Sequence, residues 1–188
     1  MQRGRGRSRC HDTPVAGWRT LSCAWGSRYP ARVDGESLLT DELRGFIGRS
    51  GPVVTVYVSA GAVERAADVF RGTREGLRLE PGAPVPGFVL AALESDVPRI
   101  DIPDPLPKSL LVSNEWHFER PLRLGEALRA QARVADITER LGGRFGQALY
   151  VRTEVEFRDD ADALVARSSM TLMHYDPSGA AGAEEGEP

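Results

Sequence analysis

The sequence predicts an α+β fold in which one antiparallel sheet carries a packed helix. Two observations predict it: the second half of the chain reads as four successive β-strands, and the good helix candidates all precede them. The predicted strands are Ser109–Glu119, Ala127–Arg140, Gly146–Arg158 and Leu164–Tyr175. Turn-forming residues separate consecutive strands, which makes hairpins and therefore an antiparallel sheet.

Each strand prediction depends on alternation with a period of two, which places every second side chain on the same face of a sheet. From Leu149 to Phe157, apolar and polar residues alternate, so we expect one apolar face and one wet face. The same pattern recurs on the last strand at Leu164, Ala166, Met170 and Leu172, and on the second at Leu128, Ala130, Ala132 and Val134. Gly142 and Gly143 mark one turn, and Asp159, Asp160 and Asp162 mark the next.

Three elements are predicted before the four strands. Ser37–Ile47 has apolar residues at helical spacing and is followed by Gly48, which can end a helix. Val53–Val58 is β-branched and reads as a strand that joins the sheet. Ser59 can cap a helix over Ala62–Phe70, whose apolar face consists of Val63, Ala66, Ala67 and Phe70.

A proline-rich stretch, Leu79–Pro107, separates this helix from the four strands. Its prolines allow at most a short helix at Gly87–Glu94, so a long central helix is not expected. We expect the segment to run over the surface or along the mouth of a cavity. Its buried side is predicted to be Phe88, Val89, Leu90 and Leu93.

Composition limits the classes of function. The chain has 188 residues, a formal net charge of -3 and 41% hydrophobic residues, which suits one domain with its own core. No apolar run approaches the roughly 20 residues that cross a bilayer, so we expect no membrane span. Basic residues after the first segment are dispersed and are not grouped with aromatic residues, so nucleic acid is not an expected partner.

The two ends of the chain differ from the middle. Residues 1–36 are predicted to be a disordered basic extension, residues 37–176 the folded domain, and residues 177–188 a disordered acidic tail. The start lacks the apolar core of a secretory signal, so we expect a cytoplasmic protein. Cys10, His11 and Cys23 lack a recognisable fourth ligand, so no metal site is predicted there. An alternative is that the first 32 residues are upstream sequence translated in error.

Three segments carry a resemblance to a known family: Trp116–Glu126 (WHFERPLRLGE), Arg133–Ile137 (RVADI) and Leu164–Ser168 (LVARS). They resemble the N-terminal-type domain of the MaoC-like dehydratases, and the similarity extends over roughly Ser37–Tyr175. The resemblance implies a single hotdog fold, a curved antiparallel sheet wrapped around a helix. It also implies an (R)-specific enoyl-CoA hydratase or 3-hydroxyacyl-thioester dehydratase that needs no cofactor, acts on acyl-CoA or acyl carrier protein thioesters, and pairs with a second hotdog subunit as a hetero- or homodimer.

The catalytic motif of that family is absent. Active members have D-x-N-x-x-H, whose carboxylate and imidazole must both reach one water. At the corresponding place this chain has Ala67–Thr73 (ADVFRGT), with Asp68 but neither the Asn nor the His. The resemblance therefore implies the non-catalytic half of a heteromer, with no catalytic residue of its own. Phe88, Val89 and Trp116 are the predicted substrate-binding residues, which shape the acyl pocket.

Other functions stay open. A hotdog thioesterase would need a carboxylate, for which Asp68 and Glu64 are candidates, and a non-enzymatic module could bind the acyl group without turnover. A homodimeric hydratase would need an unrecognised acid and base. Glu115, His117 and Glu119 share one face of the first predicted strand and could bind a metal, although a solvated face explains them more simply.

Overall fold

The computed structural model describes residues 37–103, 105–141 and 146–177. The chain divides into two units, Met1–Arg32 and Val33–Pro188, and all the described residues belong to the second. The predicted extension, the Gly142–Gly143 turn and the predicted tail apart from Pro177 lie outside the described residues. None of the helices in the described part of the chain is long and apolar enough to cross a membrane.

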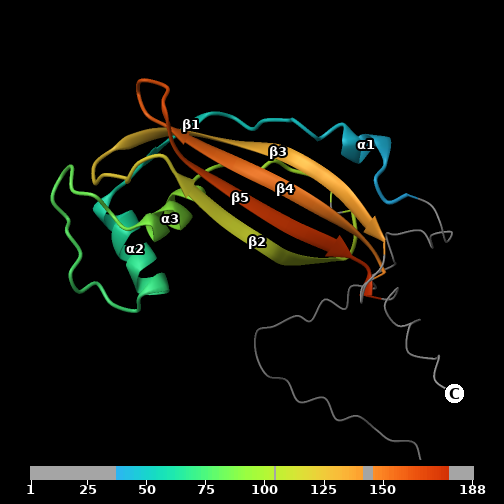
Figure 1. Cartoon of the computed structure of the whole chain (residues 1–188), viewed down its shortest axis with the longest axis horizontal. Helices are drawn as coiled ribbons and strands as arrows, with labels where there is room; N and C mark the ends of the chain where they lie inside the picture. Colours follow the sequence, from blue (N-terminus) through green and yellow to red (C-terminus); the bar gives the residue numbers. More distant parts are fainter. Residues whose placement is uncertain (1–36, 104, 142–145, 178–188) are drawn as a thin grey trace, which may run out of the picture. The chain divides into compact units, whose positions relative to one another are not determined.

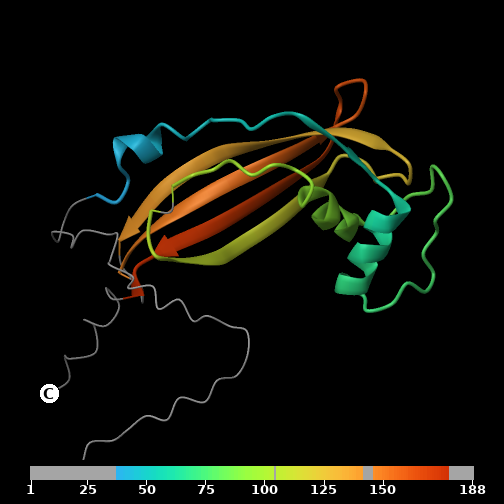
Figure 2. The same cartoon turned by 180° about the vertical axis from the view of Figure 1, so that it is seen from behind.

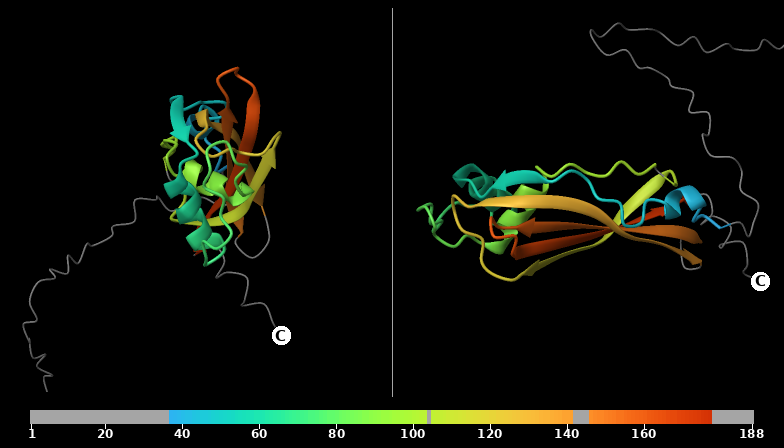
Figure 3. Two further views of the ribbon diagram at one scale, coloured as in Figure 1. Left: turned by 90° about the vertical axis from the view of Figure 1, so that its left-hand side faces the viewer. Right: turned by 90° about the horizontal axis from the view of Figure 1, so that it is seen from above.

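The five strands form one antiparallel sheet in the order β1-β3-β4-β5-β2 (Figure 1). The elements along the chain are α1 (Asp41–Arg44), β1 (Val54–Tyr57), α2 (Ala60–Phe70), the 3₁₀ helix η1 (Gly87–Val89), α3 (Leu90–Glu94), β2 (Lys108–Phe118), β3 (Ala127–Leu141), β4 (Gln147–Arg158) and β5 (Leu164–Tyr175). The four predicted strands and the short helix within the proline-rich stretch are confirmed. The curved sheet with a short helix packed on it confirms the α+β hotdog fold (Figure 3).

The main core lies between α2 and the sheet. Helices α2 and α3 are at one end of the sheet and α1 is at the other (Figures 1 and 2). Val63 and Ala66 of α2 belong to the same buried cluster as Leu128, Ala130 and Phe157 of the sheet. The small side chain of Ala130 leaves room for the helix to approach closely. The predicted apolar row of β3 is confirmed.

Helix α2 begins where Ser59 caps it, as predicted. The Ser59 side-chain oxygen accepts a hydrogen bond from the Ala62 N–H at 3.2 Å, which satisfies one of the free N–H groups of the first turn. The predicted apolar face is wrong at Phe70, which is 52% exposed. Phe70 is the last residue of the helix and lies beyond the core, where its ring stacks on Phe88.

Helix α1 is much shorter than the predicted Ser37–Ile47. The Ser37 hydroxyl donates to the Glu139 carboxylate at 2.6 Å, and the Leu38 N–H donates to the same carboxylate at 3.0 Å. These bonds tie the chain before Thr40 to β3 in a non-helical conformation, so the helix begins only after Thr40. Tertiary contacts here override an adequate helical pattern.

Two details of the sheet differ from simple alternation. Glu154, predicted to lie on the wet face, is only 6% exposed because Arg133 and Arg152 flank its carboxylate at 2.6 and 3.3 Å. On β5 both Val165 and Ala166 are fully buried. A register shift opposite Val165 adds an extra residue there, and a bulge of this kind breaks the alternation of faces.

Candidate functional site

Three aromatic side chains from separate elements meet at the end of α2. Phe70 of α2 stacks on Phe88 of η1, with ring centroids 5.7 Å apart and an interplanar angle of 22°. Phe70 also meets Trp116 of β2 edge to face, at 6.0 Å. Offset-stacked and edge-to-face pairs are the preferred arrangements of aromatic rings. We call Phe70, Phe88 and Trp116 the aromatic cluster; it brings together two of the three predicted substrate-binding residues.

Val89, the third predicted residue, occupies a different environment. Its side chain is fully buried in the core cluster under α2, whereas Phe88 and Trp116 are partly buried and pack against that cluster. Val89 therefore supports η1 from the core side, and its contact with a substrate stays a prediction. Phe70 was assigned only to the helix face from sequence, because its partners are distant along the chain.

The close approach of η1 to β2 positions Phe88. A Cβ atom placed on Gly87 would lie 3.2 Å from the nearest carbon of the Phe118 ring, closer than most side chains pack. Gly87 therefore lets the backbone of η1 lie directly against Phe118, with Phe88 next in the chain. The absence of a side chain at Gly87 is what permits this close packing.

Glu94, at the end of α3, lies beside the aromatic cluster. Burial raises the pKa of its carboxyl to about 7, while the Trp116 indole N–H and the Arg99 charge act in the opposite direction. The Trp116 Nε1 atom is buried and, among the described residues, has no partner with good hydrogen-bond geometry. The indole is thus near enough to influence the carboxyl without bonding well to it. Only the spatial proximity of α3 and β2 reveals this pair, and no sequence motif marks it.

The two carboxylates considered for a thioesterase are both bound to one arginine. Arg74 donates two hydrogen bonds to Asp68, at 2.8 and 2.6 Å, and one to Glu64 at 2.7 Å. The hydrogen bond from Arg74 lowers the pKa of Asp68. Asp68 is therefore an ionised, exposed member of an ion-pair cluster, which is a poor arrangement for a general base near neutral pH.

The segment where the family has its catalytic motif, Ala67–Thr73, spans the last turn of α2 and the residues just after it. Ala67 is fully buried, Asp68 is bound to Arg74, and Gly72 has a φ of +66° just beyond the helix. A glycine in this conformation is a common helix ending. The segment therefore ends a helix and supplies no imidazole.

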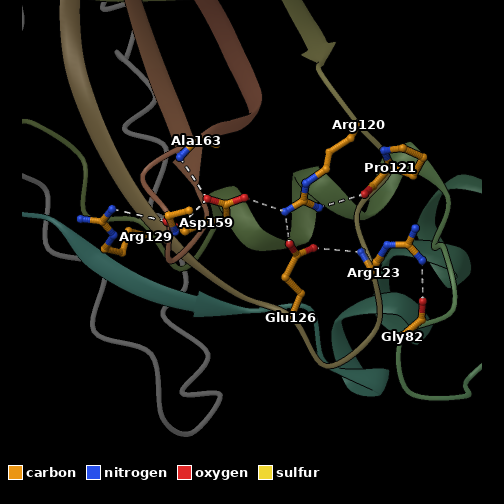
Figure 4. A network of polar contacts seen from close by, with 9 residues as sticks. Gly82, Arg120, Pro121, Arg123, Glu126, Arg129, Asp159 and Ala163 are labelled. Carbon is orange, nitrogen blue, oxygen red and sulfur yellow. Dashed lines mark hydrogen bonds and ion pairs between the residues drawn. The ribbon is translucent and has the colours of Figure 1, made fainter.

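The residues that carry the family resemblance form a polar network between β2 and β3 (Figure 4). The Arg120 guanidinium bonds to the Glu126 carboxylate and lies 3.3 Å from Asp159. The second Glu126 oxygen accepts the Arg123 N–H at 3.1 Å, and Arg123 donates to the Gly82 carbonyl at 3.0 Å. This network fixes the turn before β3 against the chain that leads into η1.

Backbone hydrogen bonds also join the turn before β3 to the chain that leads into η1. Val85 N–H donates to Leu122 O, and Leu124 N–H donates to Ala83 O, both at 2.9 Å. The residues shared with the family thus hold residues 82–85 in place, immediately before Phe88. They position the candidate site rather than form it.

Strand β2 is an exposed edge of the sheet. It is eleven residues long and pairs with β5 on one side, and no other strand in the described part of the chain pairs with it. Leu110, Leu111 and Val112 are 49%, 53% and 51% exposed. A long edge strand with exposed apolar side chains is a surface that another chain can cover.

The alternative metal or acid–base group on β2 is exposed. His117 Nε2 lies 3.2 Å from Glu119 Oε1, and both side chains are largely accessible. The residues that the structure describes contain no group of three or more His, Cys, Asp or Glu side chains suited to hold a metal ion. Cys10, His11 and Cys23 lie outside those residues.

A pocket of about 190 Å³ lies on the opposite face of the sheet from the α2 core. Its walls include Arg129, Gln131 and Arg133 of β3, which alternate with the buried residues of that strand. The pocket also includes the acidic residues Glu156 and Asp162. Because Asp162 is 2.7 Å from Arg129 and Glu156 is 2.8 Å from Arg158, much of the arginine charge is already balanced.

Comparison with known proteins finds a similarity over part of this chain. A family model for the FAS1-like dehydratase domain region matches residues 79–168, whereas no curated protein matches. This match confirms the predicted resemblance to the MaoC-like dehydratases.

Several solved structures are similar to the chain. A MaoC-like dehydratase from Rhodospirillum rubrum has 19% identity, with 69% of this chain and 92% of that chain covered and a TM-score of 0.47. The (R)-hydratase from A. caviae involved in PHA biosynthesis has 18% identity, 67% and 94% coverage and a TM-score of 0.47. The truncated HadBC complex from Mycobacterium tuberculosis, a 3R-hydroxyacyl-ACP dehydratase, has 18% identity, 68% and 96% coverage and a TM-score of 0.45.

Proposed function

We propose that this hotdog chain, with its dehydratase-family region at residues 79–168, is the non-catalytic half of an (R)-specific enoyl-CoA hydratase or 3-hydroxyacyl-thioester dehydratase. In this role it shapes the acyl pocket, and a second hotdog subunit supplies the acid and the base. The ligand is an acyl thioester of CoA or of acyl carrier protein. Four features of the chain support the proposal, and the β2 edge carries it.

The first feature is that the segment corresponding to the family's catalytic motif lacks the acid–base pair. Hydration of an enoyl thioester needs a base for water and an acid for the carbon next to the carbonyl. The segment Ala67–Thr73, at the end of α2, has Asp68, which is held by Arg74, and no histidine. A subunit that binds substrate and leaves catalysis to a partner is consistent with this segment.

The second and third features concern the pocket. The aromatic cluster offers a partly exposed apolar wall to a ligand, and apolar walls are what acyl chains bind. The helix within the proline-rich stretch, η1 with α3, spans only Gly87–Glu94. Such a short helix occupies less of the sheet face than a full-length central helix would.

The fourth feature, and the one that carries the proposal, is the free edge of β2. Three consecutive residues, Leu110, Leu111 and Val112, are about half exposed. Leu110 and Leu111 precede the register shift at Val112, so these two point to opposite faces of the strand. A partner that covered both faces could also form backbone hydrogen bonds to the free edge of β2. The sheet of a second hotdog subunit would then continue this sheet. Trp116 lies on the same strand, so such a partner would adjoin the aromatic cluster.

Affinity purification from the native cell tests the proposal. We expect the tagged full chain to carry with it, at equal stoichiometry, a second hotdog chain that has D-x-N-x-x-H. Leu111→Lys should abolish this association, because a charge would be buried at the edge. Leu141→Lys is the matched control, since Leu141 is a still more exposed leucine at the end of β3.

Each alternative predicts a different result from the same purification. Recovery of a homodimer with hydratase activity would identify an unrecognised acid and base in this chain. Recovery of the chain alone would favour an acyl-binding module. The thioesterase is disfavoured because Asp68 and Glu64 are both bound to Arg74.

A further inference from the structure

The pocket on the sheet face away from α2 contains three arginines, Arg129 and Arg133 of β3 and Arg158 of β4. The other residues that line it are Ser50, Val53, Gln131, Glu156 and Asp162. Its volume of about 190 Å³ is far above the roughly 10–15 Å³ that one water molecule needs. The aromatic cluster packs against the core on the other face of the sheet, so this pocket is a site separate from the proposed acyl pocket.

Two of the three arginines lie against each other. Arg129 and Arg158 occupy directly opposite positions of β3 and β4, and like charges in this arrangement destabilise a sheet. Asp162, in the turn between β4 and β5, contacts both. Its carboxylate accepts a hydrogen bond from Arg129 at 2.7 Å, whereas Arg158 bonds only to its backbone carbonyl, at 3.0 Å. The charge of Asp162 therefore reaches only one of the two guanidinium groups directly.

The remaining carboxylates are each shared between two arginines. Glu156 pairs with Arg158 at 2.8 Å and with Arg167 at 3.0 Å. Glu154 pairs with Arg133 at 2.6 Å and with Arg152 at 3.3 Å. In this network of described residues, five arginines thus share the three carboxylates of Glu154, Glu156 and Asp162. The network has two positive charges in excess, although the formal net charge of the chain is -3.

The pocket arginines also retain hydrogen-bond donors. Within the described part of the chain, no acceptor bonds to Nε or Nη1 of Arg129, or to Nη1 of Arg133. Ser50 adds a hydroxyl group to the wall. Hydrogen bonds from a guanidinium group to an anion are stronger than those between neutral groups. Excess positive charge and available donors in one pocket fit an anionic ligand.

The size of the excess charge indicates the kind of anion. A phosphate monoester carries a charge of about −1.5 to −2 at pH 7 and has three strong acceptor oxygens, so it can balance the network and bond to more than one arginine. A single carboxylate would balance only half of the excess. We propose that this pocket binds the phosphate monoester group of a small molecule. CoA, whose ribose carries such a group, and free inorganic phosphate are the two sources; only the CoA source rests on the proposed function.

Calorimetric titration of the purified full chain, in whatever complex it forms, tests the proposal. The probes are inorganic phosphate, acetate, CoA and dephospho-CoA, which keeps the diphosphate but lacks the monoester. If CoA is the source, we expect it to bind at least fivefold more tightly than dephospho-CoA. If free phosphate is the source, we expect inorganic phosphate to bind at least fivefold more tightly than acetate, with CoA and dephospho-CoA equal. The absence of both preferences overturns the proposal.

Two variants with opposite expected effects assign the binding to the pocket. Arg129→Gln removes one guanidinium group and should weaken binding of the preferred probe by about fivefold or more. Asp162→Asn removes the carboxylate that competes for Arg129 and should tighten binding at least twofold. Asparagine also tolerates the φ of +65° at this position, so the turn is kept. A folding defect cannot produce tighter binding, which keeps the test decisive if Arg129→Gln is unstable.

Arg65→Gln, at an exposed arginine of α2, is the matched control and should leave the affinity unchanged. Unchanged affinity in Arg129→Gln, or affinity that does not rise in Asp162→Asn, overturns the assignment to this pocket.

The outcome is distinguishable from the fate of the proposed function. A chain that recruits a catalytic partner but binds no phosphate probe through Arg129 refutes only the phosphate site. A chain that purifies without a partner yet binds phosphate through Arg129 refutes the heteromeric function and retains the phosphate site.

Discussion

Glu94→Gln should make the chain more stable above neutral pH. The pKa of Glu94 is raised by burial from 4.5 to about 7 in the folded protein, so folding favours the protonated acid. The stability associated with this group is fully present below pH 4.5 and is lost as the pH rises towards 7. Glutamine is neutral at every pH and avoids this loss.

The size of the effect follows from the shift. A shift of one pKa unit corresponds to about 1.4 kcal/mol, so the full shift sets an upper limit of about 3 kcal/mol. Glu94 is only partly buried, and screening by solvent reduces the expected value to about 1–2 kcal/mol. Between pH 5 and pH 8, the stability of Glu94→Gln relative to wild type should rise by this amount.

Urea denaturation at pH 5 and pH 8 measures the free energy of unfolding of wild type and of Glu94→Gln. The difference between the two proteins cancels the contributions of their other titrating groups. Glu75→Gln, in an exposed loop, is the control and should follow wild type. If the free energies of unfolding of wild type and Glu94→Gln change in parallel with pH, the carboxyl is not buried as described and the reasoning fails.

Three further predictions concern the supports of the site. Arg120→Ala should lower the free energy of unfolding by about 1–3 kcal/mol, because it leaves the part-buried Glu126 and Asp159 without their cation. Arg44→Ala, at an exposed arginine, is the control, and an equal loss of stability in both variants would refute a role for the network. Gly87→Ala should cost about 1 kcal/mol, since its Cβ would crowd Phe118, and unchanged thermal stability would contradict that contact. Asp68→Asn should leave the thioester turnover of the purified complex unchanged, whereas a large loss of turnover would restore the thioesterase.

The strands were predictable from sequence because their alternation is local. In β4 the apolar residues from Leu149 to Phe157 recur at every second position, and the sheet buries that face. Glu154 was not predictable as a buried residue, because its shortest ion pair is with Arg133 on the neighbouring strand β3, in addition to Arg152 on its own strand. Likewise α1 was predicted too long, because Glu139 on a distant strand ties down Ser37 and Leu38.

The candidate site was predictable only in part. Phe88 and Trp116 could be chosen as aromatic residues within the proline-rich stretch and on the first predicted strand after it. Phe70 and Glu94 enter the site through contacts between elements that are far apart along the chain, and no spacing of residues in the sequence signals such contacts.

The central claim is that this chain lacks catalysis of its own and pairs through β2 with a catalytic hotdog subunit. Native mass spectrometry of the tagged full chain, purified gently from its own cell, tests it most directly. The account predicts a complex with one copy each of this chain and of a D-x-N-x-x-H hotdog chain, and its loss in Leu111→Lys but not in Leu141→Lys. A chain that is recovered alone, or a complex that is indifferent to Leu111→Lys, would contradict it.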